Sequence, residues 1–154
     1  MLSPVLVVLT LGSWGHAVAP DPHVATLLSP RIVRVIVEKL DADAVKDGLS
    51  AKQIRTQVEG RLRRAGLIVA VDDGEPYLYV VVTTAKADEA TYAYSLSLFF
   101  GQPTVIEDYQ SLTRLKTWSV GSVGMAGNIT ISRAIRVGIG QMMDQFVNAY
   151  VPSI

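Results

Sequence analysis

The chain has 154 residues, 49% of them hydrophobic, and its 14 Lys and Arg residues balance its 14 Asp and Glu residues. A chain of this length and composition is expected to form one globular domain. Because it has no Cys, we expect no disulfide, Cys-ligated zinc, iron–sulfur cluster, thiol nucleophile or lipidated N-terminal Cys. A formal net charge of zero, without any basic tract, also argues against nucleic acid as a partner.

The N-terminal residues 1–19 differ in composition from the rest of the chain. Residues 5–11 form an apolar run interrupted only by Thr10, and small residues follow it, as in a secretory signal peptide. The run is too short to cross a membrane, which takes about 20 residues in a helix. Cleavage is expected after Ala17, because the other frame, after Ala19, puts the rigid Pro20 next to the scissile bond.

This interpretation has one open alternative. No Lys or Arg precedes the apolar run, so the positive end of the signal is the amino terminus alone, or the true start lies upstream. The competing interpretation is a short buried N-terminal strand.

Three segments are therefore predicted. Residues 1–17 are a signal peptide, residues 18–30 an extended leader containing three prolines, and residues 31–154 a single domain. The first charged residue is Asp21, so the charge balance belongs to the mature chain. The expected location is periplasmic or secreted, with no transmembrane span in the mature chain.

The first half of the domain predicts a strand, a helix and a second strand. Residues 31–40 are rich in Val and Ile and bounded by turn-forming residues. Ser50 followed by Gln53 is a capping-box pattern, and it opens a helix over about residues 50–65. The wholly apolar residues 67–71 predict a strand buried on both faces.

A hairpin follows. Residues 77–85 are dominated by Tyr, Val and Thr, and residues 91–100 alternate between large apolar and small side chains, which predicts two antiparallel strands with one covered face. Pro103 lies just beyond Gly101, which predicts a bulge or a sheet edge before residues 104–106.

The C-terminal part predicts one more strand and one more helix. After a polar turn at 107–111, residues 112–120 form a strand, and residues 121–127 form a glycine-spaced loop. Apolar residues at helical spacing predict an amphipathic helix over about residues 129–150. Gly138 and Gly140 inside it mark either close packing against the sheet or weak points.

Together these elements predict an α+β fold. We expect a two-layer sandwich, in which a mostly antiparallel sheet of four to five strands carries two helices on one face.

The catalytic side chains are few. Both histidines, His16 and His23, lie outside the predicted domain, which argues against Ser–His catalysis and most transition-metal sites. Two acidic groups, residues 72–75 and residues 41–47, are interpreted as turn chemistry rather than metal sites. We therefore expect no enzyme activity, no cofactor and no metal. A carboxylate-based hydrolase would need two acidic side chains facing each other across a cleft.

Two segments have the character of anion sites. Arg61, Arg63 and Arg64 lie in the last turn of the predicted helix, where cations interact favourably with exposed carbonyls, so we interpret them as a solvated helix end. The loop at 121–127 precedes a helix, but it has no Lys and its glycines are three apart. We interpret it as a flexible connection rather than a phosphate loop.

The aromatic residues are the remaining candidates. Tyr77 with Tyr79, and Tyr92 with Tyr94, are pairs at period two, and Trp118 lies on a later strand, so a sheet face could present them as a binding platform. The competing interpretation is that they form the core beneath the helices. We take Tyr92, Tyr94 and Trp118 as the candidate binding residues.

Four stretches of the chain carry a resemblance to known proteins: LRRAGLIVAVDDGEPYLYVVV, TYAYSLSLFF, KTWSVGSVG and MMDQFVNAY. Over roughly residues 30–150 the chain resembles small secreted bacterial α/β proteins of uncharacterised function. More distantly, the order of elements around LRRAG resembles periplasmic assembly domains. These are the curli-secretion lipoprotein, the N-terminal domain of the Tol-system propeller protein and the penicillin-binding-protein activator lipoproteins. The resemblance supplies no catalytic residue and implies a binding or assembly module of the envelope.

Two functions are carried forward from the sequence. The first is a non-enzymatic exported domain that acts in protein interaction or envelope assembly, with another envelope protein as the expected partner and an oligomeric state left open. An open sheet edge that recruits a partner strand would serve it. The alternative is a small-ligand-binding domain with a pocket between helices and sheet, lined by Tyr92, Tyr94 or Trp118.

Overall fold

The computed structural model describes residues 31–73, 76–106 and 111–150. The predicted signal peptide, its cleavage site, the leader and residues 107–110 of the predicted polar turn lie outside this part. The elements in chain order are β1 (Ile32–Val37), α2 (Ala42–Lys46), α3 (Ala51–Arg64), β2 (Ile68–Ala70), β3 (Tyr77–Lys86), β4 (Thr91–Ile106), β5 (Ser111–Gly127) and α4 (Ile131–Tyr150).

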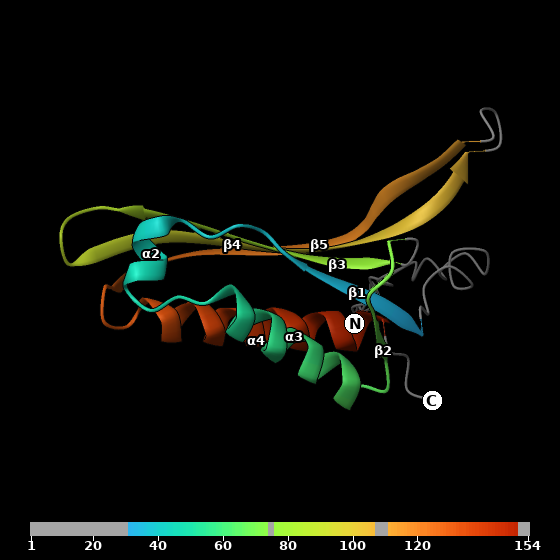
Figure 1. The fold of residues 1–154 in the computed structure, drawn as a ribbon, viewed down its shortest axis with the longest axis horizontal. Helices are drawn as coiled ribbons and strands as arrows, with labels where there is room; N and C mark the ends of the chain where they lie inside the picture. The colour runs from blue at the N-terminus through green and yellow to red at the C-terminus, as the bar shows by residue number, and fades with distance from the viewer. Residues whose placement is uncertain (1–30, 74–75, 107–110, 151–154) are drawn as a thin grey trace, which may run out of the picture.

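The strands form one open, five-stranded sheet in the order β2-β1-β3-β4-β5. β1 is parallel to β2 and β3, whereas the β3–β4 and β4–β5 pairs are antiparallel. Helices α3 and α4 lie side by side against one face of the sheet (Figure 1). The predicted two-layer α+β fold is confirmed; the sheet is mixed, and most of its paired residues are antiparallel.

Helix α3 forms where its capping pattern predicts. The Ser50 side chain accepts a hydrogen bond from the backbone N–H of Gln53 (3.4 Å). Past the other end, Gly66 has a φ of +83°, a left-handed conformation that a side chain disfavours. Ile54, Val58 and Leu62 are buried along one side of the helix, and so α3 presents its basic side chains to solvent.

Helix α2 has five residues, follows β1 and was not predicted from the sequence. The acidic residues of this segment are typical of a turn. Because Ala44 is the one buried residue of the helix, the segment shows no helical periodicity of apolar residues. The Asp41 carboxylate holds α2 to the sheet by accepting hydrogen bonds from the Thr84 backbone N–H (2.9 Å) and the Thr84 hydroxyl (2.8 Å).

These two hydrogen bonds predict a pH-dependent stability. The bond from the Thr84 backbone, followed by that from its hydroxyl, lowers the pKa of Asp41 from its ordinary 3.8. A lowered pKa means that Asp41 stabilises the fold above about pH 4, and that this contribution is lost as the pH falls through the folded-state pKa.

We expect Asp41→Ala to lower the free energy of unfolding by about 1 kcal/mol at pH 7, and by less at pH 3. Urea unfolding at both pH values measures this. Asp43→Ala is the control, because its exposed ion pair with Lys46 is expected to contribute less than about 0.5 kcal/mol. Equal losses for the two variants at both pH values would contradict the role of Asp41.

The expected burial of residues 67–71 is wrong. β2 is a three-residue strand at the sheet edge, and the side chains of Ile68 and Val71 are 60% and 89% exposed. A continuous apolar run is typical of a strand buried on both faces, but none of the helices in the described residues covers the outer face at this edge (Figure 1).

Strands β4 and β5 depart most from the sequence analysis. The expected loop at 121–127 is wrong, because these residues continue β5 and pair with Thr91–Ser97 of β4. The expected bulge is confirmed, since the register shifts between Phe100 and Gly101. β3 pairs with β4 only as far as Gly101, so beyond it β4 and β5 form a two-stranded ribbon that projects from the sheet (Figure 1).

The core lies between the sheet and α3 and α4. A cluster of aromatic side chains joins α4 to the strands. The centroid of the Phe146 ring lies 5.4 Å from that of Phe100, 5.3 Å from that of Trp118 and 5.0 Å from that of Tyr150. Gly138 marks a close approach, because a Cβ there would lie 2.5 Å from Cδ1 of Leu96 in β4. The prediction of close packing against the sheet is confirmed for Gly138.

Candidate functional site

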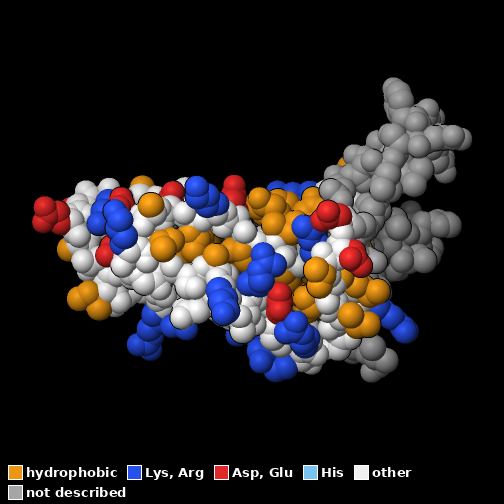
Figure 2. All heavy atoms as spheres, in the orientation of Figure 1, with side chains coloured by type: hydrophobic (Ala, Val, Ile, Leu, Met, Phe, Trp, Pro, Cys, Tyr) orange, Lys and Arg blue, Asp and Glu red, His pale blue; other side chains and the backbone are white. Residues whose placement is uncertain are grey.

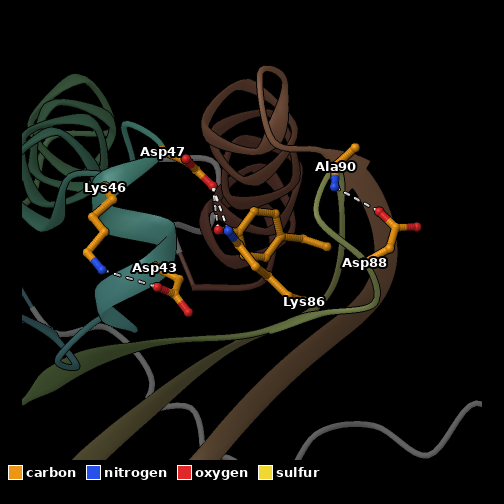
Figure 3. A network of polar contacts seen from close by, with 7 residues as sticks. Asp43, Lys46, Asp47, Lys86, Asp88 and Ala90 are labelled. Carbon is orange, nitrogen blue, oxygen red and sulfur yellow. Dashed lines mark hydrogen bonds and ion pairs between the residues drawn. The ribbon is translucent and has the colours of Figure 1, made fainter.

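Tyr92 points into the helix-covered side of the sheet and is 1% exposed. Its hydroxyl donates a hydrogen bond to the Asp47 carboxylate (2.5 Å), and Lys86 lies 3.6 Å from the same oxygen. Figure 3 shows Asp47, at the end of α2, and Lys86, on β3, pointing toward one another. The network joins α2 to the β3–β4 hairpin.

The network shifts two pKa values. Desolvation and the bond to Asp47 raise the pKa of the Tyr92 hydroxyl, and the contact with Tyr92 raises the pKa of Lys86. Both shifts favour the protonated forms of these groups.

Tyr94 and Trp118 lie on the same side of the sheet as Tyr92. The Tyr94 ring covers Gly124 of β5, where a Cβ would lie 2.5 Å from the Tyr94 hydroxyl. Trp118 contacts Phe146 and Tyr150 of α4 and is partly buried. The three candidate binding residues thus pack against helices or neighbouring strands, and their binding role stays a prediction.

The opposite, outer face of the sheet carries a different aromatic cluster. Tyr79 and Phe99 face each other across β3 and β4 with stacked rings 4.9 Å apart, and Tyr77 meets both edge-on. Lys116 lies 5.2 Å above the Phe99 ring. The sequence shows the period-two spacing of Tyr77 and Tyr79 but not the face of the sheet that they occupy. It gives no separate signal for Phe99, because its neighbours Leu98 and Phe100 are large apolar residues that point inward.

Further along the outer face, near the end of β5, there is a shallow hollow of about 500 Å³. Small side chains of β3 and β4 form its floor, including Ala85, Ala93 and Ser95. Val123 and Met125 of β5 border it, and they are 84% and 67% exposed. The hollow is therefore a mainly apolar surface open to solvent.

β5 is also the outermost strand of the sheet. The Asn128 N–H donates to the Ala90 carbonyl (2.8 Å), and hydrogen-bonding direction alternates along an antiparallel strand. The even-numbered residues of β5 therefore bond to β4 as far back as the bulge. The backbone groups of Ser119, Gly121, Val123 and Met125 point away from the sheet, and have no backbone partner in the described part of the chain.

A second surface lies on the helix layer. Three adjoining hollows, of about 580, 500 and 380 Å³, follow the seam between α3 and α4. The first two share Gln53, Gln57 and Arg136, and the last two share Arg61 and Asp144. Figure 2 shows Lys and Arg side chains gathered on the lower part of the molecule, where Figure 1 places these helices.

Within residues 31–73, 76–106 and 111–150, no three His, Asp or Glu side chains come together as a metal site would require. In the same ranges, no helix is long and apolar enough to cross a membrane.

No protein-family model and no curated protein sequence matches the chain. Solved structures with a similar fold include a minor lipoprotein from Acinetobacter baumannii, 12% identical with a TM-score of 0.47, where the match covers 80% of this chain and 92% of that one. The PelC dodecamer from Paraburkholderia phytofirmans is 9% identical with a TM-score of 0.43, over 77% and 88% of the two chains. The lipoprotein GNA1162 from Neisseria meningitidis is 13% identical with a TM-score of 0.42, over 77% and 99%.

At these identities and TM-scores the similarity is limited to the arrangement of helices and strands, and it assigns neither a family nor a role to this chain. None of these three structures is a curli-secretion lipoprotein, a Tol-system propeller protein or a penicillin-binding-protein activator. The resemblance to those families therefore stays a prediction.

Proposed function

We propose that this chain is an exported, non-enzymatic interaction domain that binds an extended segment of another envelope protein alongside β5. The observation that carries the proposal is the open edge of β5, where alternate backbone groups from Ser119 to Met125 have no backbone partner in the described chain. An incoming strand would satisfy these groups, as in recognition by strand addition.

The two edges of the sheet differ in a way that supports this assignment. β2 has three residues, and short edge strands are protected against pairing with other chains. β5 has 17 residues, and none between Ser119 and Gly127 is charged or a proline. Long edge strands without such protection readily pair with another chain unless a native partner covers them.

The outer face offers the means of selecting one partner. Side chains of an added strand alternate between the two sheet faces, so every second one would lie beside Val123 or Met125 and the apolar hollow. Backbone pairing would supply affinity, and the hollow would discriminate between side chains.

The described cavities favour this function over the ligand-binding alternative. They lie on the outer face, along the helix seam and beside α2. The space between helices and sheet is filled by packed side chains, Tyr92 among them. The absence of enzyme activity and the exported location remain part of the proposal, and they rest on the positions of His16 and His23 and on the apolar residues 5–11.

A single substitution tests the role of the β5 edge. In Val123→Pro the outward N–H is removed, while the ladder to β4 keeps its bonds because Val123 does not donate to it. We expect affinity purification from the producing cells to recover one specific envelope protein with the wild-type chain, and to lose it with Val123→Pro.

Val123→Thr is the matched control, because it changes the side chain but keeps the N–H, and it should retain the partner. Recovery of the same protein by Val123→Pro would contradict strand addition. Failure of the wild-type chain to enrich any protein would contradict the interaction function itself. Circular dichroism establishes that all three proteins are folded.

A further inference from the structure

We propose that the seam between α3 and α4 binds an acidic polysaccharide, a sugar chain that bears repeated carboxylate groups. This site lies on the face of the molecule opposite the outer sheet face, and the inference does not depend on the β5 partner.

The helix layer of the molecule is positively charged. α3 and α4 together hold seven Lys and Arg residues and two acidic residues, so their net charge is +5 in a chain whose total charge is zero. Both acidic residues are paired, Glu59 with Arg63 and Asp144 with Arg61. The positive charge is therefore concentrated on one side of the molecule, where it attracts polyanions.

The unpaired cations line the groove itself. Arg133 and Arg136 project from α4, whereas Lys52 and Arg64 of α3 lie toward the two ends of the groove. All four side chains are exposed. None of them makes an ion pair within the described residues. The planar guanidinium groups can each bind a carboxylate through two parallel hydrogen bonds.

Gly140 shapes the middle of the groove. A Cβ at this position would lie 3.0 Å from the Arg61 guanidinium and 3.4 Å from the Gln57 amide nitrogen. The absence of a side chain at Gly140 lets both groups of α3 lie against α4. Gly140 therefore packs against α3 side chains, and not against the sheet as the sequence analysis considered.

Neutral polar groups that suit the hydroxyls of a sugar chain lie between the cations. Gln53, Gln57 and Gln141 line the groove between the cations. The Gln57 amide nitrogen already donates to the Arg136 carbonyl (2.7 Å), which leaves its oxygen as an acceptor. The hydroxyl groups of a sugar chain can donate to such oxygens. A chain that has both carboxylates and hydroxyls therefore matches both the cations and the Gln amides that line the groove.

The groove does not suit two other polyanions. No aromatic side chain is among its lining residues, and single-stranded nucleic acids are held by stacking on aromatic rings. Val137 is the one large apolar side chain exposed on the described parts of α3 and α4, too few for insertion into a bilayer. The groove follows α3, whose 14 residues span about 21 Å, and this length suits a linear chain.

The test uses the purified full chain and fluorescent decamers of polygalacturonate, measured by anisotropy. The probe with free carboxylates should bind, and the same decamer with methyl-esterified carboxylates should not. Arg133→Gln/Arg136→Gln should weaken binding by about tenfold or more, because it removes charge-assisted hydrogen bonds. Lys39→Gln/Lys46→Gln removes the same charge away from the groove and should leave binding within about twofold.

Each other outcome overturns the proposal. Absence of binding, or equal binding of the esterified decamer, excludes an acidic polysaccharide. Equal weakening by the two double variants excludes the α3–α4 seam as the site. Equal or tighter binding of polyglutamate, single-stranded DNA or phosphatidylglycerol vesicles assigns the seam to a peptide, a nucleic acid or a membrane instead. A thermal unfolding midpoint close to wild type confirms that the Arg variant is folded, as expected for exposed side chains.

Discussion

Phe146→Ala should lower the free energy of unfolding by about 3–5 kcal/mol, as truncations of buried aromatic residues do. Phe146 is fully buried, and its ring contacts Phe100 on β4, Trp118 on β5 and Tyr150 one turn further along α4. Alanine would leave a cavity between three elements that cannot all move to fill it. Urea unfolding followed by circular dichroism measures the loss.

Two controls on α4 separate the cavity from an effect on the helix. Phe146→Leu fills most of the space and should cost less than the alanine variant. Asn148→Ala, at an exposed position of the same helix, should change the stability by no more than about 0.5 kcal/mol. A loss below about 1 kcal/mol for Phe146→Ala would mean that α4 is not packed on the sheet as described.

This aromatic contact also links the core to the proposed binding edge. Trp118 belongs to β5, and its ring lies 5.3 Å from that of Phe146. Its inward side chain anchors the strand, so that neighbouring residues can present unpaired backbone groups outward. The same strand, β5, therefore contributes a side chain to the core and exposes the backbone groups to which a partner strand would bind.

The alternation in residues 91–100 was enough to predict the hairpin and its covered face, because residues at period two must share a side of the sheet. The same rule assigns Tyr77 and Tyr79 to the outer face, since Tyr79 pairs with Phe99 and not with an inward residue. That assignment needs the register between β3 and β4, and a single strand does not contain it.

The glycines of residues 121–127 explain why the sequence did not predict that β5 extends to Gly127. Gly121, Gly124 and Gly127 at a spacing of three read as a flexible loop, since glycine weakens a strand. In the structure, the Tyr94 ring of β4 covers Gly124 and supplies the packing surface that the glycine lacks. Because this compensation comes from a neighbouring strand, local sequence could not reveal it.

The groove on the helix layer was missed for a similar reason. Within α3 alone, Arg61 and Arg64 are typical of a solvated helix end, and Arg136 belongs to α4, which is far from α3 in the sequence. Only the packing of α4 beside α3 brings them to one groove. Net charge, which is zero for the whole chain, gave no sign of this separation of charge between faces.

Gly138→Ala should destabilise the protein, although alanine is the better helix former by about 1 kcal/mol. The added Cβ would lie 2.5 Å from Cδ1 of Leu96, and Leu96 is 1% exposed and held within the core. Overpacking of this kind costs about 1–3 kcal/mol. We therefore expect a net loss of up to about 2 kcal/mol, measured by urea unfolding.

Gly60→Ala in α3 provides the matched control, because the nearest atom to its added Cβ is 3.7 Å away, at the end of the Arg64 side chain. The same substitution should there stabilise the protein, by up to about 1 kcal/mol. Leu96→Ala makes room for the new methyl group, so the loss caused by Gly138→Ala should be smaller in that background. Stabilisation by Gly138→Ala, equal to that of Gly60→Ala, would show that α4 lies further from β4 than described, since only contact with Leu96 distinguishes the two sites.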